Sequence, residues 1–401
     1  MQPENNDGFG QLQQKLQAIW SSVRDNDTFS HTSLIVPSLS VDQEELSKVQ
    51  GASFYEERLL FALIRLRNPN ARLIYVTSQP VHPDVVDYYL QLLVGVPAAH
   101  AKRRLQMLCL YDDSPRALTE KVLERPRVLK RLREWIAEHG PAYLTCYNTT
   151  MLERQLALEL QVPLNGVDPL LLPLGTKSGS RQTFAEAGVP HPAGFEDLHS
   201  EDDIVDALCR LAQQRPNISR AVVKINEGFS GEGNGVFTYP EAATDPAAVR
   251  QQLKQLEWSS HKEHINSFLR KFNEMGGIVE EMIEAEEVRS PSVQMRIHPD
   301  GTATLVSSHE QVLGGKTGQV YLGCRFPARE DYRHTIQDHA LRIGEVLSLR
   351  GVIGRFGIDF LLTRSGGEAW QANALEINLR MGGTTPPFHA LEFLTSGTLN
   401  T

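Results

Sequence analysis

The first 160 residues alternate between short apolar runs and amphipathic stretches, and this alternation constrains the fold more than any other feature of the chain. Apolar runs typical of buried strands lie at 32–37, 72–77, 106–111 and 142–146. Stretches with helical periodicity lie between or after them, at 56–66, 83–93, 118–138 (interrupted at Pro126) and 149–160. Because an intervening helix lets two successive strands run parallel, we expect an α/β fold with a mostly parallel sheet here.

A polar residue follows each predicted strand. These residues are Ser38, Ser78, Asp112 and Asn148. Ligands of parallel sheets often bind at the carboxyl ends of the strands, but each of these residues is also an ordinary turn residue, and the turn interpretation is favoured. This part of the chain has no GxGxxG sequence, so a dinucleotide site is not indicated.

Length and composition narrow the class of protein. A chain of 401 residues predicts two or three domains, and a net charge of −9 argues against general nucleic-acid binding. The chain has no secretory signal and no apolar run of the roughly 18 residues that a membrane helix needs. Its four cysteines form no CxxC pair, which argues against a zinc site or a disulfide framework. We therefore expect a cytoplasmic protein without nucleic-acid or membrane partners.

Two lysines and a glycine-rich loop stand out in the middle of the chain. Lys177 precedes a helix expected at 180–187, where a cation is unfavourable for the helix dipole. Lys177 therefore either contacts an anion or is simply solvated, and this segment alone favours the solvated state. Lys224 lies in a predicted strand, and residues 228–235 after it contain four glycines. Such a loop lets backbone N–H groups approach phosphates, although it matches neither a Walker nor a Rossmann loop.

Acidic residues end the next predicted strand. Residues 241–276 have a helical pattern. An apolar strand follows and ends in Glu280 and Glu281, and Ile283 and Glu287 come after it. A carboxylate at this place could accept hydrogen bonds from ribose hydroxyls, and the strand backbone could contact an adenine edge.

A second set of polar residues lies near the end of the chain. In a strand, Glu376 and Asn378 share one face, while Leu375, Ile377 and Leu379 share the other. A hairpin at 365–367 would bring Asp359 beside them. Three oxygen ligands of this kind suit Mg²⁺, although a solvated sheet face remains open for this segment taken alone.

Taken in order, these features resemble the ATP-grasp superfamily over about 165–390, and the first part resembles the pre-ATP-grasp domain that precedes it. Residues 290–294, 309–315 and 318–327 resemble the branch of peptide ligases related to pheganomycin biosynthesis. The resemblance implies an N-terminal parallel α/β domain followed by a two-lobed ATP-grasp fold. The implied limits are 1–165 for the first domain, 166–288 for the lobe with the glycine-rich flap, and 289–401 for the lobe with the metal site.

The resemblance also assigns roles to residues. ATP phosphates would be held by Lys177, Lys224 and the flap residues Gly231, Glu232, Gly233, Asn234 and Gly235. The adenine-binding hinge would be formed by Glu280, Glu281 and Ile283, and the ribose would be bound by Glu287. Mg²⁺ would be bound by Asp359, Glu376 and Asn378. The transferred phosphate would be met by an arginine, for which the candidates are Arg380, Arg296 and Arg355.

The function implied by the resemblance is ATP-dependent ligation of a carboxylate to an amine through an acylphosphate, with release of ADP and phosphate. The cofactors would be ATP and Mg²⁺, and the substrates a small-molecule or peptide carboxylate and an amine. A homodimer is compatible with this function. An ATP-grasp phosphotransferase and a nucleotide-binding regulatory protein without turnover are the alternatives. The family pattern usually continues beyond Thr401, and the sequence leaves open whether the chain is truncated there.

Overall fold

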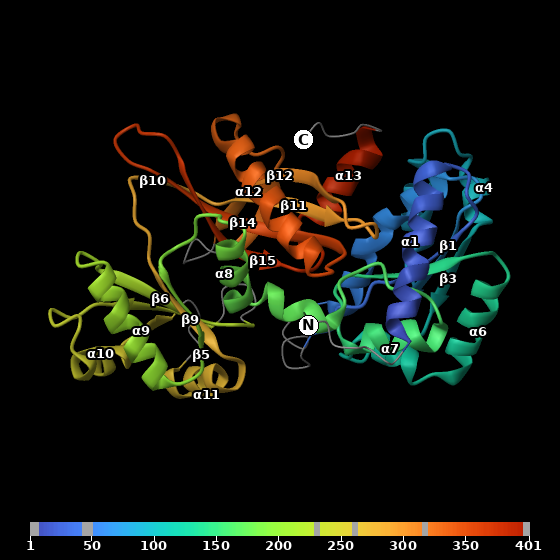
Figure 1. Ribbon diagram of the computed structural model, residues 1–401. Coiled ribbons are helices and arrows are strands. Elements are labelled where there is room, and N and C mark those ends of the chain that lie inside the picture. Colours follow the sequence, from blue (N-terminus) through green and yellow to red (C-terminus); the bar gives the residue numbers. More distant parts are fainter. Residues whose placement is uncertain (1–7, 42–50, 228–232, 259–263, 315–319, 396–401) are drawn as a thin grey trace.

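The computed structural model describes residues 8–41, 51–227, 233–258, 264–314 and 320–395. Figure 1 shows three β-sheets, each with its own helices: a first unit at the right, a middle unit at the lower left, and a third unit between and above them.

The first unit is built on a parallel sheet in the strand order β3-β2-β1-β4. Its strands are β1 (Thr32–Val36), β2 (Arg72–Thr77), β3 (Leu105–Cys109) and β4 (Ala142–Cys146). Its helices are α1 (Phe9–Asp25), η1 (Ala52–Arg67), α3 (Pro83–Gln91), α4 (Ala98–Lys102), α5 (Leu118–Leu123), α6 (Pro126–Ala137) and α7 (Met151–Leu160). The predicted parallel α/β organisation is confirmed, and both faces of the sheet are covered: Leu34 packs on the α7 side and Ile35 on the η1 side.

Helix α1 was not among the helices predicted from the sequence. Phe9, Leu12, Leu16 and Ile19 are buried along one face of this helix. Their spacing of three or four residues is the helical signal, although the polar residues around them obscure it. Helix α1 also reaches the third unit, where Trp20 Nε1 donates a hydrogen bond to Asp300 (3.3 Å).

The middle unit is built on an antiparallel sheet in the order β5-β9-β6-β7-β8. Its strands are β5 (Gly194–Leu198), β6 (Arg220–Ile225), β7 (Asn234–Thr238), β8 (Glu257–Trp258) and β9 (Gly277–Glu281). Its helices are α9 (Glu201–Gln214), α10 (Pro246–Leu253) and α11 (Ile265–Met275). The expectation of a helical stretch over 241–276 was wrong at its centre, because β8 pairs with β7 there.

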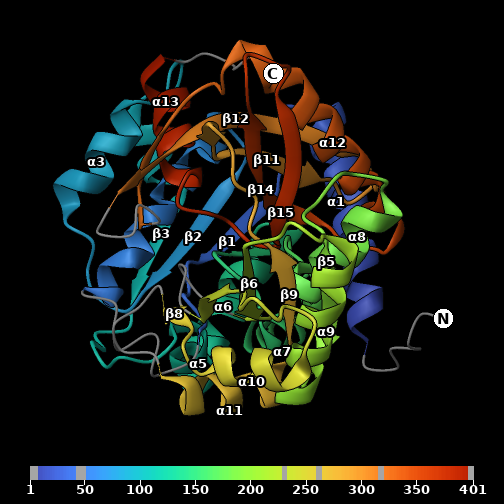
Figure 2. The ribbon, with the colours of Figure 1, turned by 90° about the vertical axis from the view of Figure 1, so that its left-hand side faces the viewer.

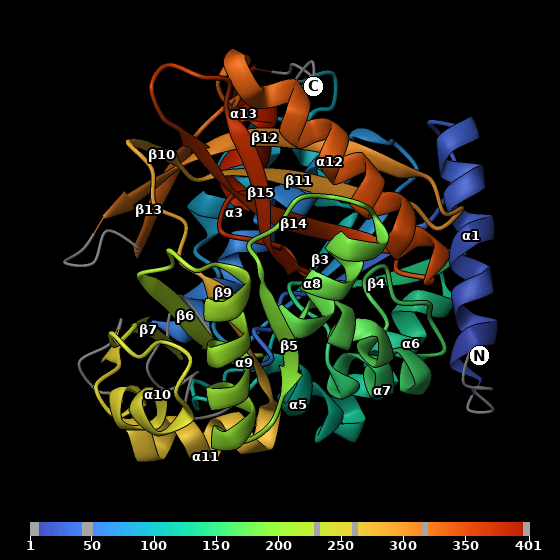
Figure 3. The same ribbon diagram turned by 60° about the vertical axis from the view of Figure 1, so that its left-hand side comes forward.

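The third unit holds a six-stranded sheet in the order β10-β14-β11-β12-β13, with β15 also on β14. Its strands are β10 (Glu287–Arg289), β11 (Pro291–Ile297), β12 (Ala303–Gly314), β13 (Val320–Arg325), β14 (Gly354–Arg364) and β15 (Gln371–Asn378). Helix α12 (Glu330–Leu349) covers one face of this sheet (Figure 3). This face is apolar and carries Met295, Phe356 and Ile358. Helix α13 (Thr385–Thr395) returns to the first unit, where Phe393 packs with residues of η1 (Figure 2).

The segment that leads into the middle unit packs against the third sheet. After η2 (Pro169–Gly175), helix α8 runs from Lys177 to Glu186, and its Phe184 is buried in the same core as Phe356. The helix begins three residues before the expected position, because Thr176 caps it by accepting a hydrogen bond from the Gly179 N–H (3.1 Å). The domain limits expected from the resemblance, at 166 and 288, therefore place α8 with the middle lobe, although α8 packs on β15. The limit at 288 also divides β10, which pairs with β14 of the third sheet.

A β-bulge changes which residues of β15 face the core. The register pairs Asp359 with Glu376 but Phe360 with Ala374, so Leu375 is the extra residue. Ala374 and Ile377 are buried, whereas Leu375 is half-buried. The expectation that Leu375 shares one face with Ile377 and Leu379 was wrong, because strict alternation fails by one residue at the bulge.

Candidate functional site

The three candidate metal ligands come together on adjacent strands. Asp359 of β14 lies directly opposite Glu376 of β15, and Gly357 lies opposite Asn378. The Asn378 side-chain amide donates a hydrogen bond to Asp359 Oδ2 (3.2 Å). One sheet face therefore presents two carboxylates and an amide at one place.

This grouping places two carboxylates that repel each other side by side. Burial, followed by repulsion from Glu376, raises the pKa of Asp359 to about 6. Gln311 of β12, which the sequence analysis did not single out, donates a hydrogen bond to Asp359 Oδ1 (2.9 Å). Carboxylate and amide oxygens are the ligands that Mg²⁺ prefers, so the donor set fits this ion. Within the described ranges, no group of three or more His, Cys, Asp or Glu residues could hold a metal ion, so the candidate site relies on the amide as its third ligand.

Lys177 connects helix α8 to this group. It is the first residue of the helix, its side chain is buried, and its Nζ lies 3.5 Å from Glu376 Oε1. The sequence left open whether this lysine contacts an anion or is solvated. In the structure it contacts the candidate metal ligand.

Lys224 is held by a buried acid in the middle sheet. Its Nζ donates a hydrogen bond to Glu280 Oε1, and Arg181 of α8 contacts Glu280 Oε2 (3.4 Å). Arg181 also binds Glu196 (3.0 Å) and the Pro192 carbonyl (2.8 Å). Sequence reasoning missed Arg181, because its partners lie on strands or loops that only the fold brings to it.

The other acids of the expected nucleotide site also have protein partners. Glu281 Oε1 accepts a hydrogen bond from the Ala193 N–H (2.9 Å), and Arg215 lies 3.3 Å from its other oxygen. Glu287 of β10 is bound by Arg364 of β14 through Nε (2.8 Å) and Nη2 (2.6 Å). Ile283 lies between β9 and β10, in the connection that joins the middle and third sheets.

The glycine-rich loop is described only at its end. Gly231 and Glu232 lie outside the described residues. Gly233 has φ of +75°, and a Cβ there would lie 2.4 Å from the Ile225 side chain, so only glycine fits. Asn234 lies opposite Lys224 in the β6–β7 pair, and Gly235 lies close to the side chains that precede and form β8.

The arginine candidates occupy different places. Arg380 Nη2 donates a hydrogen bond to Asn378 Oδ1 (3.2 Å), so this arginine stands beside the candidate metal ligands. On β11, Ser292 lies opposite Asp359, whereas Arg296 lies opposite Arg355. Arg296 follows Ser292 by four residues and Arg355 precedes Asp359 by four residues, so this pair lies away from the candidate metal ligands, toward the first unit.

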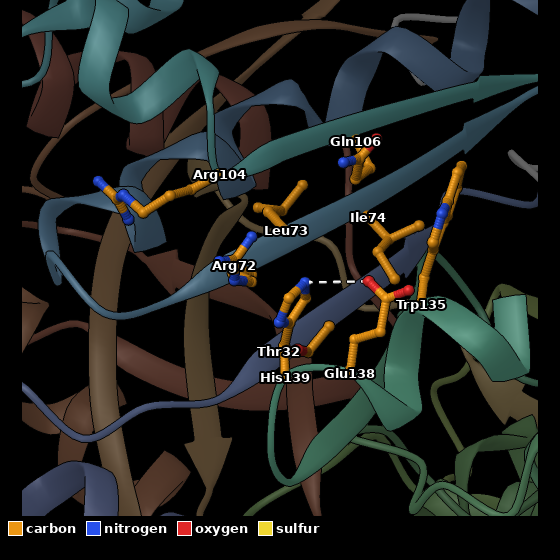
Figure 4. A pocket seen from close by; sticks show the side chains of 9 residues that line it. All are labelled: Thr32, Arg72, Leu73, Ile74, Arg104, Gln106, Trp135, Glu138 and His139. Carbon is orange, nitrogen blue, oxygen red and sulfur yellow. Dashed lines mark ion pairs between the residues drawn. The ribbon is translucent and has the colours of Figure 1, made fainter.

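Polar groups at the carboxyl ends of the first sheet bond to one another. Glu56 accepts hydrogen bonds from the Ser78 N–H and hydroxyl, and Lys121 donates to Ser78 Oγ (3.0 Å). Asn148 donates to the Ser40 carbonyl (2.6 Å). At the opposite, amino-terminal edge of this sheet lies a cavity of about 20 Å³, which has room for a water molecule (Figure 4).

Sequence comparisons find relatives over most of the chain. A family described as "IQCH-like, ATP-grasp" matches residues 173–264 and 243–401. The chain is 32% identical over 372 residues to L-propargylglycine--L-glutamate ligase of Streptantibioticus cattleyicolor, which covers 90% of this chain and 73% of the relative. It is 24% identical over 417 residues to IQ motif-containing protein H of Danio rerio. The matched region covers 92% of this chain and 39% of that protein.

Solved structures share the fold. The biotin carboxylase–β-γ-ATP complex of Campylobacter jejuni has a TM-score of 0.54 at 15% identity, over 92% of this chain and 72% of that chain. The biotin carboxylase domain of Hydrogenobacter thermophilus 2-oxoglutarate carboxylase has a TM-score of 0.54 at 12% identity, over 92% and 70%. With a matching family over more than half of its length and a 32% identical relative, the chain belongs to the ATP-grasp superfamily.

Proposed function

We propose that this protein is an ATP-dependent ligase that joins a carboxylate to an amine through an acylphosphate and releases ADP and phosphate. The observation that carries the proposal is the meeting of Lys177, Asp359, Glu376, Asn378 and Arg380 at one place on the third sheet. Cations and hard oxygen ligands together suit a nucleotide triphosphate whose terminal phosphate is transferred.

Each group has a role that follows from its charge and place. An oxygen of the substrate carboxylate attacks the γ-phosphorus, the bond to the β–γ bridging oxygen breaks, and ADP leaves. Lys177 and Lys224 bind the phosphates, and Arg380 stabilises the charge that spreads over the transferred group. Mg²⁺, held by Asp359, Glu376 and Asn378, would neutralise phosphate charge. The amine then attacks the acylphosphate carbonyl and phosphate leaves, so no protein nucleophile is needed.

The buried pair of Glu280 and Arg181 positions the side chain of Lys224. Because Arg181 holds one oxygen of Glu280, the other oxygen fixes the Lys224 ammonium at the end of β6, next to the glycine-rich loop. The backbone around Ile283 would contact adenine, and Glu287 would bind the ribose after exchange of its partner Arg364.

The named relative narrows the substrates. A protein called L-propargylglycine--L-glutamate ligase joins two amino acids by its name, and this supports an amino acid as acid and as amine substrate here. A phosphotransferase that leaves a stable phosphorylated product is the alternative, since the same groups would serve the first step. A regulatory protein without turnover is disfavoured by the complete set of charged groups.

The test is ADP release by the purified chain with ATP, Mg²⁺ and pairs drawn from a panel of amino acids, with mass spectrometry of the product. We expect release that requires both an acid and an amine, and a product lighter by one water than their sum. Glu376→Gln and Asp359→Asn should each lower kcat by about 100-fold or more, whereas Glu368→Gln, exposed in the β14–β15 hairpin, should not. ADP release with the acid alone and a stable phosphorylated acid would select the phosphotransferase, and no release with any pair would select the regulatory protein.

A further inference from the structure

Three arginines from two units meet on the same sheet face as Asp359. Arg296 of β11 and Arg355 of β14 lie directly opposite each other, and residues directly opposite in an antiparallel pair point to the same face. Arg65 of η1 acts electrostatically on both of them from the first unit. Arg65 is itself fixed there by hydrogen bonds to Ser33 Oγ and to Thr145 Oγ1 (3.2 Å).

The protein supplies little negative charge to this cluster. Among the residues that the structure describes, Arg296 and Arg355 make no hydrogen bond or ion pair through their side chains, and Arg296 lies over the Trp20 ring (5.2 Å). The carboxylate that acts on Arg355 is Glu392 of α13, which is already hydrogen-bonded to His389 Nδ1. His389 is 7% exposed, and its Nε2 has no hydrogen-bond partner among the described residues.

The arrangement is costly unless an anion joins it. Burial, followed by repulsion from Arg65, lowers the pKa of Arg296 to about 10. Burial, followed by repulsion from Arg296, lowers the pKa of Arg355 to about 9. Like charges that a fold holds together out of water are typical of functional sites, because a ligand of opposite charge removes the repulsion.

We propose that Arg65, Arg296 and Arg355 bind the carboxylate of the acid substrate that is not phosphorylated, so that this substrate is a dicarboxylic acid or a dicarboxylic amino acid. The inference rests on the proposed ligase function. A guanidinium binds a carboxylate through two parallel N–H donors, and two such groups side by side can bind both of its oxygens.

The spacing along β14 suits this role. Arg355 precedes Asp359 by four residues, which is about 13 Å between Cα atoms in a strand, and the long arginine side chains shorten the gap. A substrate that lies along this face places one carboxylate where the γ-phosphate is transferred and the other at the arginines. Arg380 remains the arginine beside the transferred phosphate, and Arg296 becomes a substrate-binding residue.

The first test compares substrates that differ in one carboxylate. The acyl-phosphate step is measured without amine substrate, with hydroxylamine as trap, for L-glutamate, L-aspartate and L-2-aminoadipate and for the amides of each carboxyl group. We expect Arg355→Gln and Arg296→Gln to raise KM for the preferred dicarboxylate by about 10- to 100-fold. KM for the amide that keeps only the reacting carboxylate should be the same in each variant as in the wild type. Arg355→Lys should raise KM for the dicarboxylate less than Arg355→Gln does. Arg270→Gln, an exposed arginine of α11, is the control.

The inference would be overturned by a preference for monocarboxylic acids, or by an equal effect of the variants on the dicarboxylate and its amide. An effect on KM for the amine substrate alone would also overturn it, because the arginines would then bind the other reactant.

A binding test separates this inference from the ligase proposal. Glutarate is titrated without ATP and followed by calorimetry in the wild type, Arg355→Gln and Glu376→Gln. Binding that is lost in Arg355→Gln and kept in Glu376→Gln supports the arginine site even if no pair of substrates releases ADP. Ligase activity with no glutarate or glutamate binding at the arginines would leave the function standing and reject this site.

Discussion

At the scale of single residues, buried charges of this chain are fixed by partners distant in sequence. Glu280 is held by Lys224 and Arg181, and Glu56 is held by Ser78 near Lys121. Asp359 differs, because its nearest charged neighbour across the strand is the acid Glu376. Glu280 and Glu56 are held in place by their partners. Asp359 and Glu376 repel each other, and this repulsion marks the place where a cation would bind.

Glu56 should make stability depend on pH. Burial raises its pKa from 4.5 to about 6, despite hydrogen bonds from Ser78 and the charge of Lys121. Because the folded-state pKa is the higher one, the folded chain binds more protons than the unfolded chain between pH 4.5 and 6, and stability falls as pH rises through this window. Relative to Glu56→Gln, the wild type should lose about 2 kcal/mol of unfolding free energy from pH 4.5 to 7, measured by urea denaturation. A difference that is flat or rises with pH would contradict the assignment.

Arg181 should be needed for stability as well as for the site. Replacing it by Leu leaves Glu196 and the Pro192 carbonyl without their buried donor, while Glu280 keeps Lys224. We expect Arg181→Leu to lower the unfolding free energy by about 3–5 kcal/mol. The control Arg270→Leu, whose side chain is 66% exposed, should change it by no more than about 0.5 kcal/mol. Equal unfolding free energies of the two variants would show that the contacts of Arg181 do not stabilise the fold.

At the scale of elements, local backbone chemistry sets where the site residues stand. The Thr176 cap begins α8 at Lys177, and the bulge at Leu375 restores Glu376 to the face opposite the core. The turn into β7 depends on Gly233, whose positive φ and contact with Ile225 leave no room for a side chain. The Thr176 cap, the bulge at Leu375 and Gly233 thus each shift neighbouring residues of the candidate site by a residue or a turn.

Gly233→Ala should therefore destabilise the β6–β7 hairpin. A left-handed backbone and a Cβ 2.4 Å from Ile225 together predict a loss of about 1–3 kcal/mol. Gly323 of β13 offers the matched control, because a Cβ there meets nothing within 4 Å and its φ is not positive. Gly323→Ala should be neutral or stabilise by up to about 1 kcal/mol. Thermal and chemical unfolding measure both, and a neutral Gly233→Ala would rule out the steric argument.

At the scale of the whole molecule, the third sheet rests between the other two units and is tied to the first by polar contacts. Trp20 and Arg24 of α1 both bind Asp300, and the Met381 N–H donates to the Tyr147 carbonyl (3.3 Å), just beyond β15. These contacts join the third unit to the first unit, which carries Arg65. Within the described ranges, no helix is both long enough and apolar enough to cross a bilayer.

Asp300→Ala should weaken the contact between these units. It removes the acceptor of Trp20 Nε1 and of Arg24 Nη1 (3.0 Å), and also that of the Thr302 N–H within its own turn (3.0 Å), so we expect a loss of about 1–3 kcal/mol in unfolding free energy. Asp206→Ala, an exposed acid of α9 with only an i,i+4 partner, should cost no more than about 0.5 kcal/mol. Indistinguishable unfolding curves for the two variants would mean that α1 does not stabilise the third unit.

The sequence by itself determined the parallel sheet of the first unit and the order of the lysines, the glycine-rich loop and the Asp359, Glu376 and Asn378 group. Alternation of apolar residues and the sterics of glycine act within a few residues, so both can be read from the chain. Only the tertiary structure decided which groups come together: the ion pairs of Lys177 with Glu376 and of Arg181 with Glu280, and the cluster of the like charges Arg65, Arg296 and Arg355. It also decided the bulge at Leu375 and the role of α1. The pairs and the role of α1 depend on contacts between segments far apart in sequence, and the bulge depends on the register of β15 against β14. Their geometry is set by the packing of whole sheets and helices rather than by local pattern.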